Sequence, residues 1–210
     1  MARTYGTRRG DADPGAGELC PAAPARYRGR MGFFTRRPTA AVRHALHAHR
    51  TDSVLAQAPL VTSSGEAWVV ATRAELLLVS APGAPDTDGS AVDVVRREWA
   101  EVDRATYDTE SNVIRVHWVD GGEPTPLPLD GRRSVLPQVL RERVQWSVVL
   151  AEPVRLPGGG SARVAVRRRV DGALFSQVIG RGEVDLSDPR VAGAIDEAEA
   201  RVRNAAGLPA

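Results

Sequence analysis

The chain has 210 residues, of which 42% are hydrophobic and 26% charged, a composition typical of a soluble globular protein of one ordinary domain with tails. Its single cysteine, Cys20, excludes an intramolecular disulfide and a zinc site built from cysteines. No apolar run reaches the roughly 18–20 residues that span a bilayer, and residues 1–30 lack the apolar core of a signal peptide. We therefore expect a cytoplasmic protein.

Positive charge is concentrated at the N-terminus. Residues 1–50 hold ten Arg and three acidic residues, a net charge of +7, whereas residues 51–210 hold 18 Arg and 23 acidic residues, a net charge of −5. Residues 1–30 are rich in Ala, Gly, Pro and Arg and show no periodicity, which predicts a disordered basic arm. Such an arm can meet nucleic acid, anionic lipid or an acidic partner, or it can be a solvated tail. Because the chain contains no Lys, abundant Arg is weak evidence for phosphate binding.

A short helix is predicted from Thr39 to Arg50, directly after Pro38. Thr39 suits the N-cap position, and Val42 and Leu46 lie on one face of the helix. Helix and linker together form a segment over residues 31–53 that precedes the main domain.

Residues 54–129 have the patterns of β-strands. Apolar residues alternate with polar ones or form short runs bounded by turn residues, and Trp68, Trp99, Trp118 and Tyr107 are expected in the core. Residues 81–89 form a loop by composition. The predicted strands cover residues 55–61, a hairpin of 68–72 and 76–80, then 99–107, 113–119 and a short edge strand at 127–129.

A helix pattern follows, and then a hairpin and a last helix. Leu136, Leu140, Val144 and Val148 recur every four residues, after Ser134 as the cap. Strands are predicted at residues 163–170 and 174–179, around the hairpin signal Asp171-Gly172. A final helix is predicted to begin after Asp188 and to end at Gly207.

The segment Trp68-Val-Val-Ala-Thr-Arg-Ala-Glu-Leu-Leu-Leu-Val resembles the opening hairpin of bacterial PH-like and GRAM-like domains. Residues 99–107 resemble their third strand, and the resemblance covers roughly residues 54–180. Residues 136–149 and 188–208 are also similar to an uncharacterised family of short proteins from high-GC Gram-positive bacteria.

This resemblance implies an α+β fold. A PH-like small β-barrel or two-sheet sandwich would occupy about residues 54–184, with one inserted helix and one C-terminal helix, so that the domain covers residues 54–210. It also implies a binding module, since PH-like domains bind phosphoinositides, peptides or proteins, and the peptide binders add a strand to a sheet edge.

Two basic groups are candidate binding sites. Arg163, Arg167 and Arg169 alternate with apolar residues, so they share one strand face, which we expect to be exposed. That face could hold a phosphate or an acidic peptide, or it could be a solvated face that protects a sheet edge. The second group consists of two aromatic and three basic residues, Phe33, Phe34, Arg36, Arg37 and Arg43. These side chains could insert into an anionic bilayer surface, or the two Phe side chains could fix the short helix to the domain.

The sequence gives no catalytic or metal-binding pattern. It contains no Gly-x-Ser-x-Gly motif, and Gly158-Gly159-Gly160 lacks the spacing of a phosphate-binding loop. His44 and His47 share a helix face, but Asp52 is the only nearby carboxylate, so a solvated helix is the favoured interpretation. We expect no catalytic residue, metal or cofactor, and with few exposed aromatic residues we do not expect nucleic acid as a partner.

The sequence therefore predicts a non-catalytic binding or scaffolding module that acts on a protein partner. A first alternative is peripheral binding to an anionic membrane, at the inner face of the cell membrane, through the basic N-terminal segment. A second is a small enzyme whose site only the fold assembles. The partner and the oligomeric state stay open.

Overall fold

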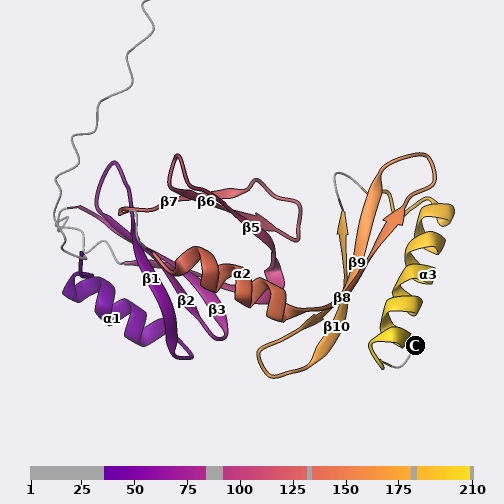
Figure 1. Cartoon of the computed structure of the whole chain (residues 1–210), viewed down its shortest axis with the longest axis horizontal. Coiled ribbons are helices and arrows are strands. Elements are labelled where there is room, and N and C mark those ends of the chain that lie inside the picture. Colours follow the sequence, from indigo (N-terminus) through magenta and orange to yellow (C-terminus); the bar gives the residue numbers. More distant parts are fainter. Residues whose placement is uncertain (1–35, 84–91, 132–133, 181–183, 209–210) are drawn as a thin grey trace, which may run out of the picture. The chain divides into compact units, whose positions relative to one another are not determined.

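The computed structural model describes residues 36–83, 92–131, 134–180 and 184–208 (Figure 1). The helices and strands follow the order expected from the sequence, with two additional strands, one at residues 93–98 and one at residues 148–155. The elements are α1 (Ala40–His49), β1 (Val54–Leu60), β2 (Glu66–Thr72), β3 (Glu75–Ala81), β4 (Asp93–Glu98), the 3-10 turn η1 (Trp99–Glu101), β5 (Val102–Asp108), β6 (Val113–Trp118), β7 (Thr125–Pro128), α2 (Leu136–Ser147), β8 (Val148–Arg155), β9 (Ser161–Arg168), β10 (Leu174–Gly180) and α3 (Pro189–Ala205).

The described strands form three antiparallel sheets, ordered β1-β2-β3-β4, β5-β6-β7 and β10-β9-β8. The first two sheets meet where Leu60 forms a β-bridge with Leu129 and Val61 N–H donates to the Pro128 carbonyl at 2.8 Å. The fold class is thus α+β, as predicted. No closed barrel forms among the described strands, so the barrel alternative is wrong.

The main hydrophobic core lies between the first two sheets and α2 (Figure 1). Leu136, Leu140 and Val144 of α2 are buried there, as their four-residue spacing predicts. Trp99, at the start of η1, is 2% exposed in the same core. Burial of each large aliphatic side chain contributes about 1.5–3 kcal/mol, so the helix is held mainly by this packing.

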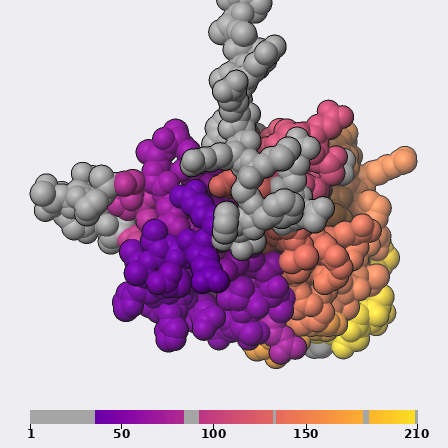
Figure 2. Space-filling view, turned by 60° about the vertical axis from the view of Figure 1, so that its left-hand side comes forward, coloured from indigo at the N-terminus to yellow at the C-terminus, as the bar shows by residue number. Residues whose placement is uncertain are grey.

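The outer face of the first sheet is covered by α1. Val42 and Leu46 pack against Trp68, Val70 and other outward side chains of the first sheet. Because successive strand residues point to opposite faces, β2 is buried on both sides. The helix agrees with the sequence prediction, and Thr39 caps it by accepting a hydrogen bond from Val42 N–H. In Figure 2, α1, coloured indigo, forms part of the molecular surface.

The third sheet packs against α3 through a separate hydrophobic cluster. Val164 and Val166 of β9 face Ile195 and Val202 of the helix. The predicted hairpin at Asp171-Gly172 is present, with Gly172 at φ 88°, a conformation that favours glycine. Asp188 caps α3 as predicted, since its carboxylate accepts from Arg190 N–H at 2.9 Å.

Three details differ from the sequence prediction, and two predictions fall on residues that the structure does not fully describe. Residues 99–101 form a 3-10 turn and not the start of a strand, because Trp99 turns into the core. The second helix ends at Ser147, and Val148 begins β8. Tyr107 is 37% exposed and not in the core. The predicted arm at residues 1–30 lies outside the described residues, and the loop at 81–89 lies mostly outside them.

Candidate binding cleft

A cavity of about 540 Å³, here called the Asp103 cleft, opens between the β5–β6 hairpin and the sheet β10-β9-β8. Both β5 and β10 are at the edge of their sheets, so their outer backbone groups have no strand partner among the described residues. The volume lies within the range of ligand sites, about 300–1,000 Å³. The cleft is lined by Asp103, Arg104, His117, Trp118, Gly121, Gly122, Glu123, Pro124, Pro153, Ser161, Ala162, Arg163, Ile179 and Gly180.

A β-bulge brings two neighbouring polar side chains into this cleft. The register between β5 and β6 shifts between Val102 and Arg104. In a regular strand, Asp103 and Arg104 would point to opposite faces, but a bulge re-aims one of them. Both line the cleft as a result.

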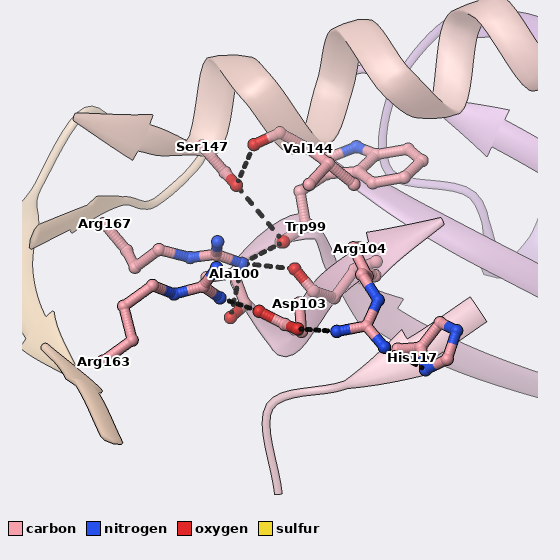
Figure 3. Close-up of polar contacts among 10 residues, drawn as sticks. Trp99, Ala100, Asp103, Arg104, His117, Val144, Ser147, Arg163 and Arg167 are labelled. Carbon is pink, nitrogen blue, oxygen red and sulfur yellow. Dashed lines mark hydrogen bonds and ion pairs between the residues drawn. The ribbon is translucent and has the colours of Figure 1, made fainter. Parts of the chain in front are cut away.

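Asp103 is the centre of a polar network (Figure 3). Its side chain is 9% exposed and accepts a hydrogen bond from Arg163 of β9. The Arg104 guanidinium lies 3.5 Å from the other carboxylate oxygen of Asp103 and 3.3 Å from His117 Nδ1. The ion pair of Asp103 with Arg163 thereby joins the second sheet to the third.

The cleft carries little net charge at neutral pH. Burial, together with the charges of Arg104 and Arg115, lowers the pKa of His117 below 6.5, so its imidazole is neutral there. Arg104 and Arg163 are then balanced by the carboxylates of Asp103 and Glu123. A multiply charged phosphate group finds no excess of positive charge in such a site, whereas the polar backbone of a peptide can be accommodated.

Arg167 lies beside this network and is fully buried, at 0% exposure. Its Nη2 donates to the carbonyls of Trp99, Ala100 and Val102 at 2.5 to 3.1 Å (Figure 3). Its Nε and Nη1 have no hydrogen-bond partner among the described residues. Burial, and secondarily the charge of Arg163, lowers the pKa of Arg167 to about 10, which leaves the guanidinium protonated at neutral pH.

The three predicted arginines, Arg163 and Arg167 in β9 and Arg169 directly after it, have different surroundings. They do share a strand face, but that face is exposed only in part, because Arg167 at its middle packs against η1 and the start of β5. Arg167 is therefore an internal group, which corrects the expectation of three solvated cations. Arg163 lines the cleft, and Arg169 lies 3.6 Å from Glu98 at the surface. Their role in binding stays a prediction.

The second predicted group is partly described. Arg36 lies 3.6 Å from Asp130, Arg43 donates to the Pro38 carbonyl at 2.6 Å, and Arg37 is exposed. Phe33 and Phe34 lie outside the described residues. The structure thus joins neither Arg36 nor Arg43 to the arginines of β9, and the two groups are separate features.

Sequence reasoning missed the acidic and histidine side of the cleft. Asp103 and His117 come from neighbouring strands whose polar residues indicated only an exposed face. Their meeting with Arg163 depends on a contact between residues 60 positions apart, and no local pattern reports it. The short run of Gly121 and Gly122 was a visible signal, but only for a turn.

Comparison with protein-family models, with curated proteins and with solved structures finds no match for this chain. No helix within the described ranges is long and apolar enough to cross a membrane. Nor do the described His, Cys, Asp and Glu side chains form a group of three or more that could hold a metal ion.

Proposed function

We propose that this chain is a non-catalytic, PH-like binding module that holds an extended segment of a protein partner in the Asp103 cleft. The observation that carries the proposal is the position of β5 and β10, which are both edge strands and both line the cleft. An extended peptide can pair its backbone with such an edge while its side chains occupy the pocket beside it.

The order of elements supports the PH-like part of this proposal. Four antiparallel strands are followed by three more and then by α2, which packs into the core between the two sheets. This order is compatible with the two-sheet sandwich that the resemblance implies. The strands β8–β10 and α3 then form an addition that supplies the second wall of the cleft.

The cleft itself favours a peptide over a small charged ligand. Its formal charges balance, and Trp118, Pro124 and Ile179 give it apolar surface. Among the described residues, no Ser, Thr or Cys side chain hydrogen-bonds to His117, so the enzyme alternative gains no support. In the membrane alternative, the apolar face of α1 cannot contact lipid, because Val42 and Leu46 are buried against the first sheet.

The proposal is tested by selecting peptides from a displayed random library on the full chain and measuring their affinity by fluorescence anisotropy. Arg104→Glu reverses a charge in the cleft, and Ser161→Trp fills part of it. We expect each to weaken the selected peptides by at least about tenfold. Arg141→Glu makes the same charge change at an exposed position of α2 that does not line the cleft, and it should leave binding unchanged. Failure to enrich any peptide, or equal binding to all variants, would refute the proposal.

A further inference from the structure

Trp146, near the end of α2, is in contact with two guanidinium groups. Arg143 from the same helix and Arg168 from the end of β9 each place Cζ 5.3 Å from the centroid of the indole ring. The two cations therefore lie no farther apart than twice that distance. All three side chains are partly exposed. We call them the Trp146 cluster.

The Trp146 cluster carries uncompensated positive charge. Across the described ranges, neither Arg143 nor Arg168 forms an ion pair, in contrast to Arg96, Arg97 and Arg201, which each bind a carboxylate. The indole face attracts a cation by only about 0.5–1 kcal/mol at an exposed site. Two neighbouring cations held in this way are a favourable place for an anionic group from outside the chain.

Besides the positive charge, the cluster contains an aromatic ring, which is also typical of protein-binding surfaces. Trp and Arg are the residue types most enriched at the energetic centres of protein interfaces. Stacking on the ring restricts both guanidinium groups before a partner arrives, which reduces the entropy lost on binding.

We infer that the Trp146 cluster binds an acidic segment of a protein partner, in which two carboxylates are separated by one residue. In an extended chain, such side chains lie about 7 Å apart on one face. That spacing fits within the maximum separation of the two guanidinium groups, so each carboxylate can meet one arginine. This inference rests on the proposed function, since it assigns a charge pattern to the same partner.

The experiment uses a fluorescein-labelled (Glu-Ser)5 peptide and the full chain, with anisotropy as the readout. We expect binding that weakens as salt rises, and at least about a tenfold loss in the double variant Arg143→Gln/Arg168→Gln. The matched control Arg141→Gln/Arg155→Gln removes the same charge from exposed positions of α2 and β8 and should change affinity less than about twofold. Circular dichroism of both variants confirms that the fold is kept.

Three outcomes would overturn the inference. The first is that (Glu-Ser)5 does not bind, or binds no better than (Gln-Ser)5. The second is that both double variants weaken binding equally, which would show a general charge effect. The third is tighter binding of a single-stranded oligothymidine than of (Glu-Ser)5, which would assign the cluster to nucleic acid. None of these affects the selection on the Asp103 cleft, so the two proposals fail separately.

Discussion

Arg167 is a buried cation that binds backbone carbonyls and no carboxylate among the described residues. Three carbonyl groups of η1 and β5 accept hydrogen bonds from its Nη2. Removing a guanidinium from water is costly, and a buried charge persists only where hydrogen bonds offset that cost. These bonds connect β9 to the turn that precedes β5, and we expect them to stabilise the contact between the second and third sheets.

Arg167→Met tests this balance, because Met fills a similar volume without donating hydrogen bonds. We expect the free energy of unfolding to fall by about 2 kcal/mol, since hydrogen bonds made by a charged group contribute about 1.5–3 kcal/mol. Urea denaturation followed by tryptophan fluorescence measures it, with Arg115→Met on the exposed surface as the control. A more stable Met variant would show that burying the charge costs more than its bonds return.

For single residues, the sequence predicted on which strand face a side chain lies better than it predicted which residues contact that side chain. The alternation in β9 correctly placed Arg163 and Arg167 on one face. It could not reveal that this face is covered at Arg167, because the covering residues, Trp99 to Val102, are distant in sequence and bind through their carbonyl groups, which every residue has. Asp103 was missed because a bulge has no clear sequence signature here.

At the scale of elements, α1 is attached to β2 through Glu66. The Glu66 carboxylate accepts from Thr39 N–H at 3.2 Å and from Trp68 Nε1 at 2.7 Å. Burial alone would raise the pKa of Glu66, but the hydrogen bonds from Thr39 and Trp68 outweigh it and lower the pKa below 4.5. A carboxylate with a lowered pKa stabilises the fold above its unfolded-state pKa, and this contribution is lost as the pH falls through the folded-state pKa.

Glu66→Gln should therefore make stability less dependent on pH. The amide keeps an acceptor for Thr39 and Trp68 but cannot be protonated in this range. We expect a smaller fall in the free energy of unfolding between about pH 6 and about pH 3.5 than in the wild type. Urea denaturation at both values measures it, and Glu110→Gln at an exposed turn is the comparison. Identical pH profiles for Glu66→Gln and the wild type would contradict the assignment.

Helix and strand types were largely predictable, but some boundaries were not. The periodic spacing of Leu136, Leu140 and Val144 identified α2. Val148 continues that spacing and yet begins β8, because β8 pairs with β9, where Val148 lies opposite Arg167. A tertiary contact overrides the helical pattern at this point, and a β-branched residue accepts the extended conformation readily.

At the scale of the whole molecule, the three hydrophobic clusters are distinct. The cluster of β8–β10 and α3 shares no buried residue with the cluster around α2 or with that under α1. Ala198 of α3 is fully buried in it, and its small size sets how closely the helix approaches the sheet. Extra methylene groups in a packed core typically cost about 1–3 kcal/mol.

Ala198→Leu should loosen that cluster alone. We expect hydrogen exchange followed by mass spectrometry to show faster exchange in β8–β10 and α3, while peptides from β2 and β3 keep wild-type rates. The conservative variant Ala194→Leu, at a partly buried site of the same helix, should have a smaller effect. Uniformly faster exchange over all the described strands would show that the clusters unfold as one unit.

The charged edge strand β4 has a consequence for encounters between molecules. An open sheet edge is a template for strands of other chains, and charges placed along it discourage such pairing. β4 borders the first sheet and carries Asp93, Arg96, Arg97 and Glu98, with Arg96 fixed by Glu75 at 2.8 Å. A second copy that approached this edge would have to remove water from these ions, so the charges disfavour fibril-like stacking along β4.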